Sequence, residues 1–558
     1  MYKLDIFILV LILVMLSMYF WNYRQRLRYV REKIINSWGK KKKKNYTEEE
    51  MISILSYFKN TKDKKTFFID DITWNDLNMD EVFSIINNTQ SSVGEEFLYN
   101  TLREPLFDER KLKERDSIVE YFSCNEKERV ETQYVIAKFG KDKIACISDF
   151  FNNVWIGSNK LSYYRILSFM PVIFIGVFLL TKVAMILLIT LILIIFNSFI
   201  HYFHFRKNVC EMRRFNYIAS MILCAERITK LQINHIKSYF PTIDYSIKNL
   251  KKIKNSSFTF FDPDVTNDMD IIMDYIKMFF LLDVIKFEKT NLIIGKNKDD
   301  LEKIYEFIGT IDCCISIASY RKSLKYYTKP VFVSLHGSKQ LKFKDMYHPL
   351  IKEPVSNSCE IYKSILITGS NASGKSTFLK TVAINSILGQ TIYTCLANKY
   401  KSSYFKIYTS MALRDNLTGN DSYYIVEIKS LKRIMENINN KIPCLCIIDE
   451  ILRGTNTVER IAASSEVLNS IANGNCLCLS ATHDLELTSI LNIVFDNYHF
   501  QENITRDKII FDYKLYHGIS ETRNAIKLLS IMGYSDVIVS NAEKMADNFL
   551  NSGIWNEI

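Results

Sequence analysis

A glycine-rich stretch in the C-terminal half has the residue types and spacing of a phosphate-binding loop. Residues 369–376 (GSNASGKS) match GxxxxGK[ST], follow the β-rich run 364–368 (SILIT), and precede a stretch with helical periodicity. Glycines let such a loop wrap closely, so that backbone N–H groups and the next helix N-terminus face the phosphates. We expect Lys375 to reach the β- and γ-phosphates and Ser376 to ligate Mg²⁺. The predicted nucleotide contacts in this loop are Gly369, Ser370, Asn371, Ala372, Ser373, Gly374, Lys375, Ser376 and Thr377.

Two adjacent carboxylates end a second apolar run. Residues 444–448 (CLCII) have the composition of a buried strand, and Asp449 and Glu450 follow directly. Asp449 is expected to hold Mg²⁺, usually through water. Glu450 lies one residue on and faces the other side, where it could polarise the attacking water as a general base.

A histidine follows a third apolar run. Residues 476–480 lead into Ala481, Thr482, His483 and Asp484. A histidine at the C-terminal edge of a parallel sheet is placed to sense a γ-phosphate, although a structural role is the alternative. The three runs together predict an ABC-like α/β P-loop ATPase domain over residues 336–558. Its predicted catalytic residues are Glu450, Lys375 and His483, its metal ligands are Ser376 and Asp449, and its cofactors are ATP and Mg²⁺.

These motifs resemble those of the MutS mismatch-repair family. Residues 449–457 (DEILRGTNT) followed by ATH are similar to the family's DEIGRGTST-like run and its ATH switch, with Leu452 in place of a glycine. The loop TGSNASGKST is similar to the family's TGPNMGGKST. Residues 419–427 (GNDSYYIVE) resemble GRSTFMVE, with one extra residue before Ser422.

The resemblance implies a composite site in a dimer. In the family, the segment that corresponds to residues 419–427 presents a serine to the nucleotide of the partner subunit, which would give Ser422 a role in trans. The residues 348–350 (HPL) resemble the family's HP element and make His348 a further nucleotide-binding candidate. The resemblance therefore implies a homodimer.

Looser matches extend the resemblance to most of residues 65–558. The segment with Thr89, Gly94 and Leu102 resembles the start of the family's core domain, and the helix with Asp312 resembles its end. We find no counterpart of the mismatch-reading domain, and the core is short. The resemblance thus implies an ATPase and leaves DNA as a partner that the sequence does not establish.

The net charge of +11 is concentrated in one segment. Between Arg24 and Lys44 the chain has ten basic residues and one acidic residue, so the other residues together carry only +2. This distribution does not predict the broad basic surface of a DNA clamp. We expect a basic juxtamembrane stalk over residues 22–48 that acts as topology signal and solvated spacer. Binding of anionic lipids and binding of DNA are the alternatives.

Apolar segments next to basic residues predict membrane insertion. Residues 6–21 lack charge and precede the basic segment, which favours a transmembrane anchor over residues 1–21 rather than a cleaved signal peptide. Residues 161–200 contain two apolar runs separated by Lys182 and predict a transmembrane hairpin; a buried hairpin of a soluble core is the alternative. Basic residues at both ends place the ATPase domain in the cytoplasm and the protein in the cell membrane, as a multi-pass protein.

The remaining segments predict an all-α core and lever. Residues 49–160 and 201–335 have apolar residues at three- and four-residue spacing. His201 and His204 lack a further ligand nearby and are interpreted as interfacial residues. The twelve cysteines include no CxxC pair and fit a reducing compartment.

Three functions remain open from the sequence. The first is a membrane-anchored MutS-like ATPase whose hydrolysis cycle moves the core helices. The second is an ABC-type transporter ATPase, although three membrane helices are few and no LSGGQ-like signature occurs. The third is a scaffold that uses ATP only as a dimerisation switch and acts on a membrane or protein partner.

Overall fold

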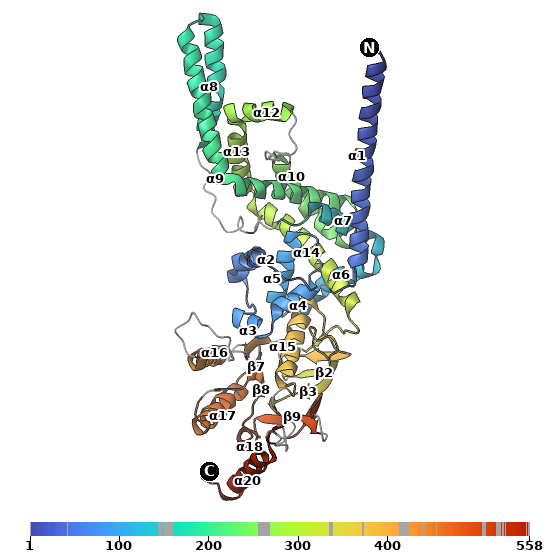
Figure 1. Cartoon of the computed structure of the whole chain (residues 1–558), viewed down its shortest axis with the longest axis vertical. Helices are drawn as coiled ribbons and strands as arrows, with labels where there is room; N and C mark the ends of the chain where they lie inside the picture. The colour runs from blue at the N-terminus through green and yellow to red at the C-terminus, as the bar shows by residue number, and fades with distance from the viewer. Residues whose placement is uncertain are drawn as a thin grey trace. The chain divides into compact units, whose positions relative to one another are not determined.

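The computed structural model divides the chain into two units, each described here by itself. Unit 1 comprises Met1–Lys65, Ile85–Asn100 and Arg115–Ser323, and unit 2 comprises Thr66–Ser84, Thr101–Glu114 and Leu324–Ile558 (Figure 1). The structure describes residues 2–41, 43–142, 148, 160–254, 268–333, 339–370, 373–411, 423–438, 441–453, 455–504, 509–519, 526, 529, 532–553 and 555.

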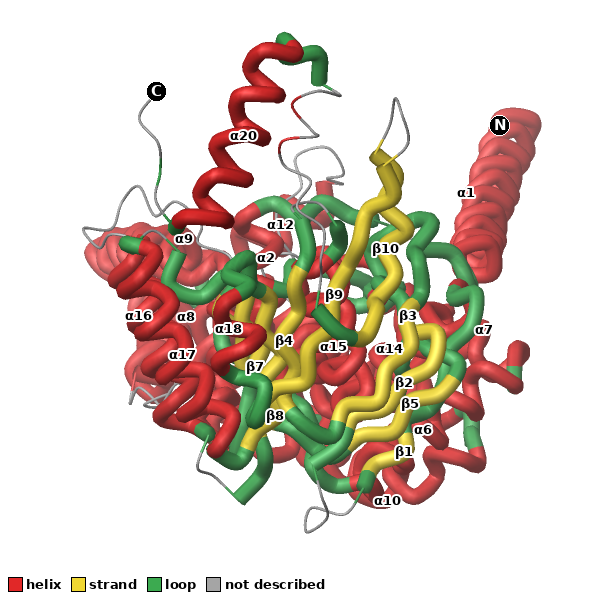
Figure 2. The backbone as a smooth tube through the Cα atoms, turned by 90° about the horizontal axis from the view of Figure 1, so that it is seen from below, coloured by secondary structure: helices red, strands yellow, loops and turns green. Residues whose placement is uncertain are grey.

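A six-stranded sheet forms the centre of unit 2, with strand order β10-β9-β4-β8-β7-β6 (Figure 2). Its strands are β4 (Ser364–Thr368), β6 (Lys406–Ser410), β7 (Cys444–Asp449), β8 (Cys476–Ala481), β9 (Phe495–Ile504) and β10 (Ile509–His517). Neighbours are parallel except for the antiparallel pair β9–β10. Every residue of β4 and β8 is buried, as expected for parallel strands covered on both faces. The carboxyl ends of β4, β7 and β8 therefore meet at one edge.

A second, four-stranded sheet in unit 2 has the order β1-β5-β2-β3. It contains β1 (Val331–Phe332), β2 (Leu341–Met346), β3 (Asn357–Ile361) and β5 (Lys399–Ser402). Only β1 and β5 pair in parallel. The sequence analysis did not predict this sheet, because its strands are only two to six residues long and carry no motif.

Helix α15 (Lys375–Ile392) links the two sheets of unit 2. The Phe378 ring on its first turns lies 6.2 Å from the ring of Phe343 in β2 and 5.9 Å from that of Phe500 in β9. The other helices wholly within this unit are α3 (Asp71–Asp76), α16 (Tyr423–Asn437), α17 (Thr457–Asn473), α18 (Glu486–Ile490) and α20 (Asp536–Ser552). The motifs predicted an α/β domain with a P-loop between a strand and a helix, and the structure has this arrangement at β4 and α15.

Part of the segment predicted as helical core belongs to unit 2 instead. Asp76 at the end of α3 accepts a hydrogen bond from the Thr409 hydroxyl of β6 at 2.6 Å, and Asp70 accepts one from Arg433 of α16 at 2.8 Å. These contacts explain why residues 66–84 and 101–114 group with the α/β part of unit 2. The structure thus differs from a single core segment over residues 49–160. Helices α4 (Met79–Ile86), α5 (Ser92–Arg103) and α6 (Glu109–Cys124) each contain residues of both units.

The described residues of unit 1 form helices and the segments that connect them, and none of these residues is in a strand. Its helices are α1 (Tyr2–Ser37), α2 (Glu48–Thr61), η1 (Lys62–Lys64), α7 (Glu126–Phe139), α8 (Lys160–Thr181), α9 (Ala184–Lys230), η3 (Asn234–Tyr239), α10 (Phe240–Asn249), α11 (Lys251–Lys254), α12 (Asp268–Phe279), α13 (Leu282–Lys296) and α14 (Lys298–Ser323). The mostly helical N-terminal part matches the prediction from apolar spacing.

One buried carboxylate joins two distant segments of unit 1. Asp312 of α14 accepts hydrogen bonds from the backbone N–H groups of Gln90 and Ser91 and from the Ser91 hydroxyl, at 2.7–3.1 Å. A Cβ atom at Gly94 would lie 2.1 Å from Asp312 Oδ2, so this position requires glycine. The contact gives a physical reason for a glycine five residues after Thr89.

Helices α8 and α9 are long and apolar enough to cross a membrane. Their most apolar windows have mean hydropathies of 1.9 and 2.4, and only 17% and 11% of those residues are buried within the structure. The helices lie side by side as a hairpin (Figure 1), and Asn197 of α9 donates a hydrogen bond to the Leu167 carbonyl of α8 at 3.2 Å. The residues predicted as the first anchor lie in α1, which runs without a break to Ser37.

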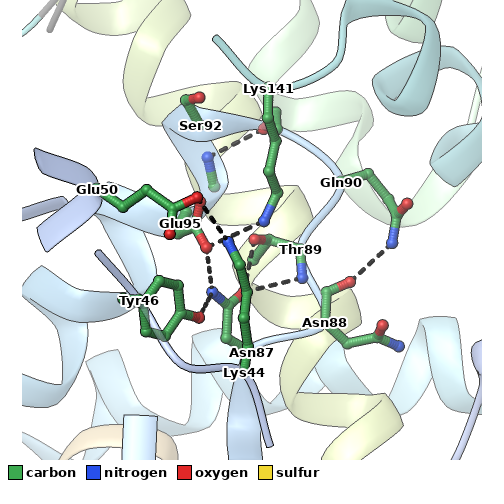
Figure 3. A network of polar contacts seen from close by, with 12 residues as sticks. Lys44, Tyr46, Glu50, Asn87, Asn88, Thr89, Gln90, Ser92, Glu95 and Lys141 are labelled. Atoms are coloured by element: carbon green, nitrogen blue, oxygen red, sulfur yellow. Dashed lines mark hydrogen bonds and ion pairs between the residues drawn. The ribbon is translucent and has the colours of Figure 1, made fainter. Parts of the chain in front are cut away.

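The basic segment after α1 makes backbone contacts within unit 1, while Lys40, Lys41, Lys43 and Lys44 are exposed to solvent. The Gly39 N–H donates to the Ser319 hydroxyl at 3.1 Å. Figure 3 shows the continuation of this segment: Lys44 pairs with Glu50 at 3.5 Å, and Tyr46 accepts a hydrogen bond from Asn87 at 2.8 Å.

The helix also separates the lysines from any bilayer that holds residues 6–21. At ~1.5 Å per residue, Ser37 lies about 24 Å along α1 from Trp21, well beyond a Debye length of about 8 Å. Arg24 and Arg28 lie within about 11 Å of Trp21 along α1, so lipid contact by residues 24–44 stays a prediction. Farther up α1, Arg31 forms an ion pair with Glu131 of α7 at 2.7 Å.

Candidate functional site

The glycine-rich loop leads from β4 into α15, as the sequence predicts. Gly369 and Gly374 have φ values of 142° and 108°, and a Cβ at Gly369 would lie 2.7 Å from the Phe500 carbonyl oxygen. Both positions therefore favour glycine. The Lys375 ammonium donates to the carbonyls of Gly369 and Ser370 at 2.7 and 2.9 Å. Burial lowers the pKa of Lys375, while the nearby carboxylates of Asp449 and Glu450 oppose that shift.

Asp449 and Ser376 have the arrangement expected of Mg²⁺ ligands. Asp449 ends β7, and its carboxylate is hydrogen-bonded to the Ser376 hydroxyl on the first turn of α15. Burial raises the pKa of Asp449, and its Oδ1 atom is buried without a hydrogen-bond partner among the described residues. An unpaired buried carboxylate oxygen beside a hydroxyl suits a hard cation. The described residues contain no cluster of three His, Cys, Asp or Glu side chains that could hold a metal, so the remaining ligands would come from phosphate and water.

Glu450 lies between two cationic or potentially cationic side chains. Its Oε1 is 2.9 Å from His483 Nε2, and its Oε2 is 2.8 Å from Arg453 Nη1. His483 Nε2 also lies 3.3 Å from Lys375 Nζ. Lys375, Glu450 and His483, which come from three separate motifs, thus meet at His483 Nε2, which can donate to Glu450 or accept from Lys375 but not both at once. The sequence analysis did not identify Arg453.

A second glutamate fixes the turn that carries Glu450. Glu450 and Leu452 both have left-handed backbones, with φ of 55° and 54°. The Leu452 N–H donates to the buried Glu427 Oε1, and burial raises the pKa of Glu427. Glycine is usual at this position in the family's DEIGRGTST-like run because glycine adopts a left-handed backbone without strain, and Leu452 adopts the same conformation here. The sequence contained Glu427 within the 419–427 match but gave no indication of its partner.

Asp484 anchors the loop that carries His483. Its carboxylate accepts two hydrogen bonds from the Arg460 guanidinium of α17, at 2.9 and 2.6 Å. This paired geometry raises the pKa of Arg460 and orients both groups. The Thr482 N–H donates to the Ile367 carbonyl at 3.0 Å, which ties the same loop to β4.

A cavity of about 540 Å³ opens beside the phosphate-binding loop. His348 lines it, and burial together with Lys380 lowers the pKa of this imidazole to about 4, so His348 is neutral at pH 7. The aromatic rings of Phe500 and Tyr513 line the cavity near Gly374. This volume and these two rings suit a nucleoside next to the phosphates. The sequence analysis missed Tyr513 and Phe500, since no motif contains them.

The structure brings together most of the predicted site residues. The cavity is lined by Ser370, Ser373, Gly374, Lys375, Ser376, Thr377, His348 and Glu450. Asp449 and His483 adjoin it through the contacts above. Asn371, Ala372 and Ser422 lie outside the described residues.

Sequence comparisons agree with this geometry. Residues 365–550 match the family model for MutS domain V. This match covers a third of the chain and, with the relatives below, supports a relationship to the MutS family. Among its relatives, the DNA mismatch repair protein MutS of Thermotoga maritima is 28% identical over 346 residues, 58% of this chain and 43% of that protein. MutS protein homolog 4 of Mus musculus is 29% identical over 293 residues, 49% of this chain and 30% of that protein.

The MutS match is partial. The DNA mismatch repair protein MutS of Clostridium botulinum strain Okra is 25% identical over 340 residues, again less than half of that protein. The chain thus spans less than half the length of these relatives. Domain V belongs to an ATPase family, which fits the site described above.

Proposed function

We propose that this MutS-family chain is a membrane-anchored ATPase that hydrolyses ATP at a composite site formed by two copies. The observation that carries the proposal is the convergence of Lys375, Glu450 and His483 on the cavity that the phosphate-binding loop lines. Three motifs that span 108 residues, from Lys375 to His483, meet there within hydrogen-bond distance.

The site has the groups needed for hydrolysis. The loop and Lys375 would hold the phosphates, and Ser376 and Asp449 would hold Mg²⁺, which neutralises charge on the phosphates when bound. Glu450 would accept the proton of the attacking water, and His483 would contact the γ-phosphate. Glu450 can face that water only if its contacts with His483 and Arg453 break. We therefore expect nucleotide binding to break these two contacts.

Exposed apolar side chains support a dimer. On α16, Tyr424, Ile425, Val426 and Ile428 are 36–39% exposed, and Val458 on the first turn of α17 is 77% exposed. Exposed apolar residues gathered around a site mark protein interfaces. Ser422 precedes α16, which supports its contribution to the partner's nucleotide.

Three segments support the membrane location. The hairpin α8–α9 carries exposed leucines such as Leu179 and Leu180, at 69% and 87% exposure. Arg165 on one side and Arg206 on the other favour cytoplasmic ends, and so does the basic segment after residues 6–21. ATP is available on that side. Duplex DNA is the candidate substrate that the relatives' names suggest for the moving helices.

The test of hydrolysis is the Glu450→Gln variant, measured as full-length protein in detergent with ATP and Mg²⁺. We expect turnover to fall by about 10²- to 10⁴-fold, the usual effect of losing a general base, while ATP affinity stays within about threefold. The Lys375→Ala variant should lose ATP binding and is the matched control for the loop. Full turnover in Glu450→Gln would refute the proposed mechanism.

The hairpin is tested separately by labelling intact cells with a membrane-impermeant maleimide. Thr181→Cys at the hairpin tip should react, whereas the exposed native Cys124 and Cys210 should react only after lysis. Labelling of Cys124 or Cys210 in intact cells, or no reaction at Thr181→Cys, would contradict the topology.

A further inference from the structure

The outer face of the four-stranded sheet in unit 2 carries an unusual concentration of lysines. Residues alternate along each strand, so Lys342 and Lys344 of β2 share one face with Lys399 and Lys401 of β5, while Leu341, Phe343, Tyr400 and Ser402 point to the buried side. Figure 2 shows these strands side by side. Lys329 precedes β1 at the same edge.

The pairing register places lysine directly opposite lysine. Lys342 faces Lys401, and Lys344 faces Lys399. Side chains at such positions have Cβ atoms about 4.5–5.5 Å apart, where like charges destabilise a sheet. Two such lysine pairs lower the stability of the sheet. Arrangements that lower local stability in this way often occur at functional sites.

Little of this charge is neutralised within the chain. Lys342 pairs with Glu360 of β3 at 2.9 Å and lies 4.5 Å from the Tyr362 ring centroid, and the two contacts raise its pKa. Lys344, Lys399 and Lys401 form no ion pair with any residue that the structure describes. The face therefore presents exposed charges that an anionic ligand could neutralise.

These lysines line a hollow of about 500 Å³ with Thr328, Val331 and the edges of Phe343 and Tyr400. The lining contains five lysines and one glutamate, Glu360, for a net charge of +4. None of these residues lines the ATP cavity. A concave volume of this size lies within the range of roughly 300–1,000 Å³ that holds small ligands.

We propose that this lysine hollow binds a small ligand with several phosphate groups, either a soluble polyphosphate ester or a phosphorylated lipid headgroup. Each lysine carries a compact ammonium group, whereas arginine carries a planar guanidinium. Ammonium groups on flexible side chains can contact phosphate oxygens from several directions. The hollow shape selects a compact ligand over a duplex, whose phosphates lie on a convex surface. Bound phosphates would neutralise the facing lysine pairs, so binding should stabilise unit 2.

Calorimetric titration of the full chain in detergent tests this site. A Lys375→Ala background weakens phosphate binding at the ATP loop, and the effect of the lysine-hollow variants is measured in that background, so the result does not depend on the proposed ATPase function. The probes are inorganic tripolyphosphate, glycerophosphoinositol 4-phosphate as a lipid headgroup without acyl chains, and a 20-base-pair duplex. We expect one tripolyphosphate or headgroup per chain, with affinity that falls as KCl is raised. Tighter binding of tripolyphosphate indicates the soluble source, and tighter binding of the headgroup indicates the lipid.

The decisive variant is Lys344→Gln/Lys399→Gln, which removes one facing pair. We expect its affinity to fall at least tenfold, while its melting temperature without ligand equals or exceeds that of the parent because repulsion is relieved. The matched control Lys432→Gln/Lys544→Gln removes two exposed charges from α16 and α20 and should change affinity less than twofold. Unchanged affinity in the decisive variant, or a site that takes the duplex but neither small probe, would overturn the proposal.

Discussion

The nucleotide site of unit 2 and the polar core of unit 1 use buried charge for different purposes. At the site, Lys375, Glu450 and His483 contact one another beside an open cavity, where a ligand can rearrange them. In unit 1, Asp312 is fully buried and holds two segments more than two hundred residues apart. Changes to the first group should alter the rate of ATP hydrolysis with little effect on the free energy of unfolding. Changes to the second group should alter the free energy of unfolding with little direct effect on the rate of hydrolysis.

The largest expected effect on stability is that of Gly94→Ala. Its new methyl group would overlap Asp312 Oδ2 and break the hydrogen bonds of that carboxylate. Overpacking and lost charged hydrogen bonds together predict a loss of about 3–5 kcal/mol in the free energy of unfolding. Chemical denaturation in detergent measures it.

The matched control is Gly176→Ala in α8, where no atom lies within 4 Å of the added Cβ. Alanine is the better helix former, so its stability should be unchanged or raised by up to about 1 kcal/mol. Equal stability of the two variants would show that the Asp312 contact does not hold unit 1 together.

The pH dependence of stability tests Asp312 itself. Burial raises its pKa to about 6, although the hydrogen bonds from Ser91 and Gln90 oppose the shift. A carboxyl whose folded pKa is raised stabilises the protein fully below pH ~4, and that contribution is lost as the pH rises through 6. Relative to Asp312→Asn, the native chain should lose up to about 3 kcal/mol of stability between pH 4 and 7. A constant difference between the two over that range would contradict the assignment.

A positioning effect on rate is expected at Glu427. Glu427→Ala removes the acceptor for the Leu452 N–H and frees the turn that carries Glu450. Small misplacement of a reacting group is expected to lower kcat by roughly 10- to 100-fold. The KM for ATP should stay within about twofold, because Glu427 does not line the cavity.

Rescue separates this role from general damage to the fold. Glu427→Gln keeps a carbonyl acceptor for Leu452 and should retain kcat within about threefold of the native value. Equal losses in both variants would show that Glu427 acts by its charge and not by holding the turn.

The smallest effect is expected at the α1–α7 ion pair. Arg31 and Glu131 have side chains that are 47% and 36% exposed. Exposed pairs contribute about 0–1 kcal/mol, so Arg31→Gln should change stability by less than about 1 kcal/mol. A loss above about 2 kcal/mol in the free energy of unfolding would contradict the expectation that exposed contacts of unit 1 contribute less to stability than its buried contacts.

The two regions also differ in how far the sequence predicts them. Three motifs of the nucleotide site are contiguous in the sequence, and each predicts one local structure. They are the loop around Lys375, the Asp449–Glu450 pair and the strand before His483. The sequence therefore predicted the α/β domain and the group of charges at its sheet edge. Arg453, Glu427 and Tyr513 were missed because a left-handed turn and the pairing of β9 with β10 bring them to the site.

In unit 1, apolar spacing predicted helices but not their partners. No local pattern links Asp312 to Gln90, or the Gly39 backbone to Ser319. The assignment of residues 66–84 and 101–114 to unit 2 depends on long-range contacts such as Thr409 with Asp76. The membrane segments were predicted from length and composition alone, and membrane insertion stays a prediction.

The central claim is that two copies share an ATP site that closes on nucleotide and reopens on hydrolysis. Multi-angle light scattering of full-length Glu450→Gln in detergent, with and without ATP and Mg²⁺, tests it most directly. The account predicts that ATP doubles the protein mass of Glu450→Gln, and that Lys375→Ala keeps the nucleotide-free mass under the same conditions. A mass of Glu450→Gln that does not respond to bound ATP would contradict the claim.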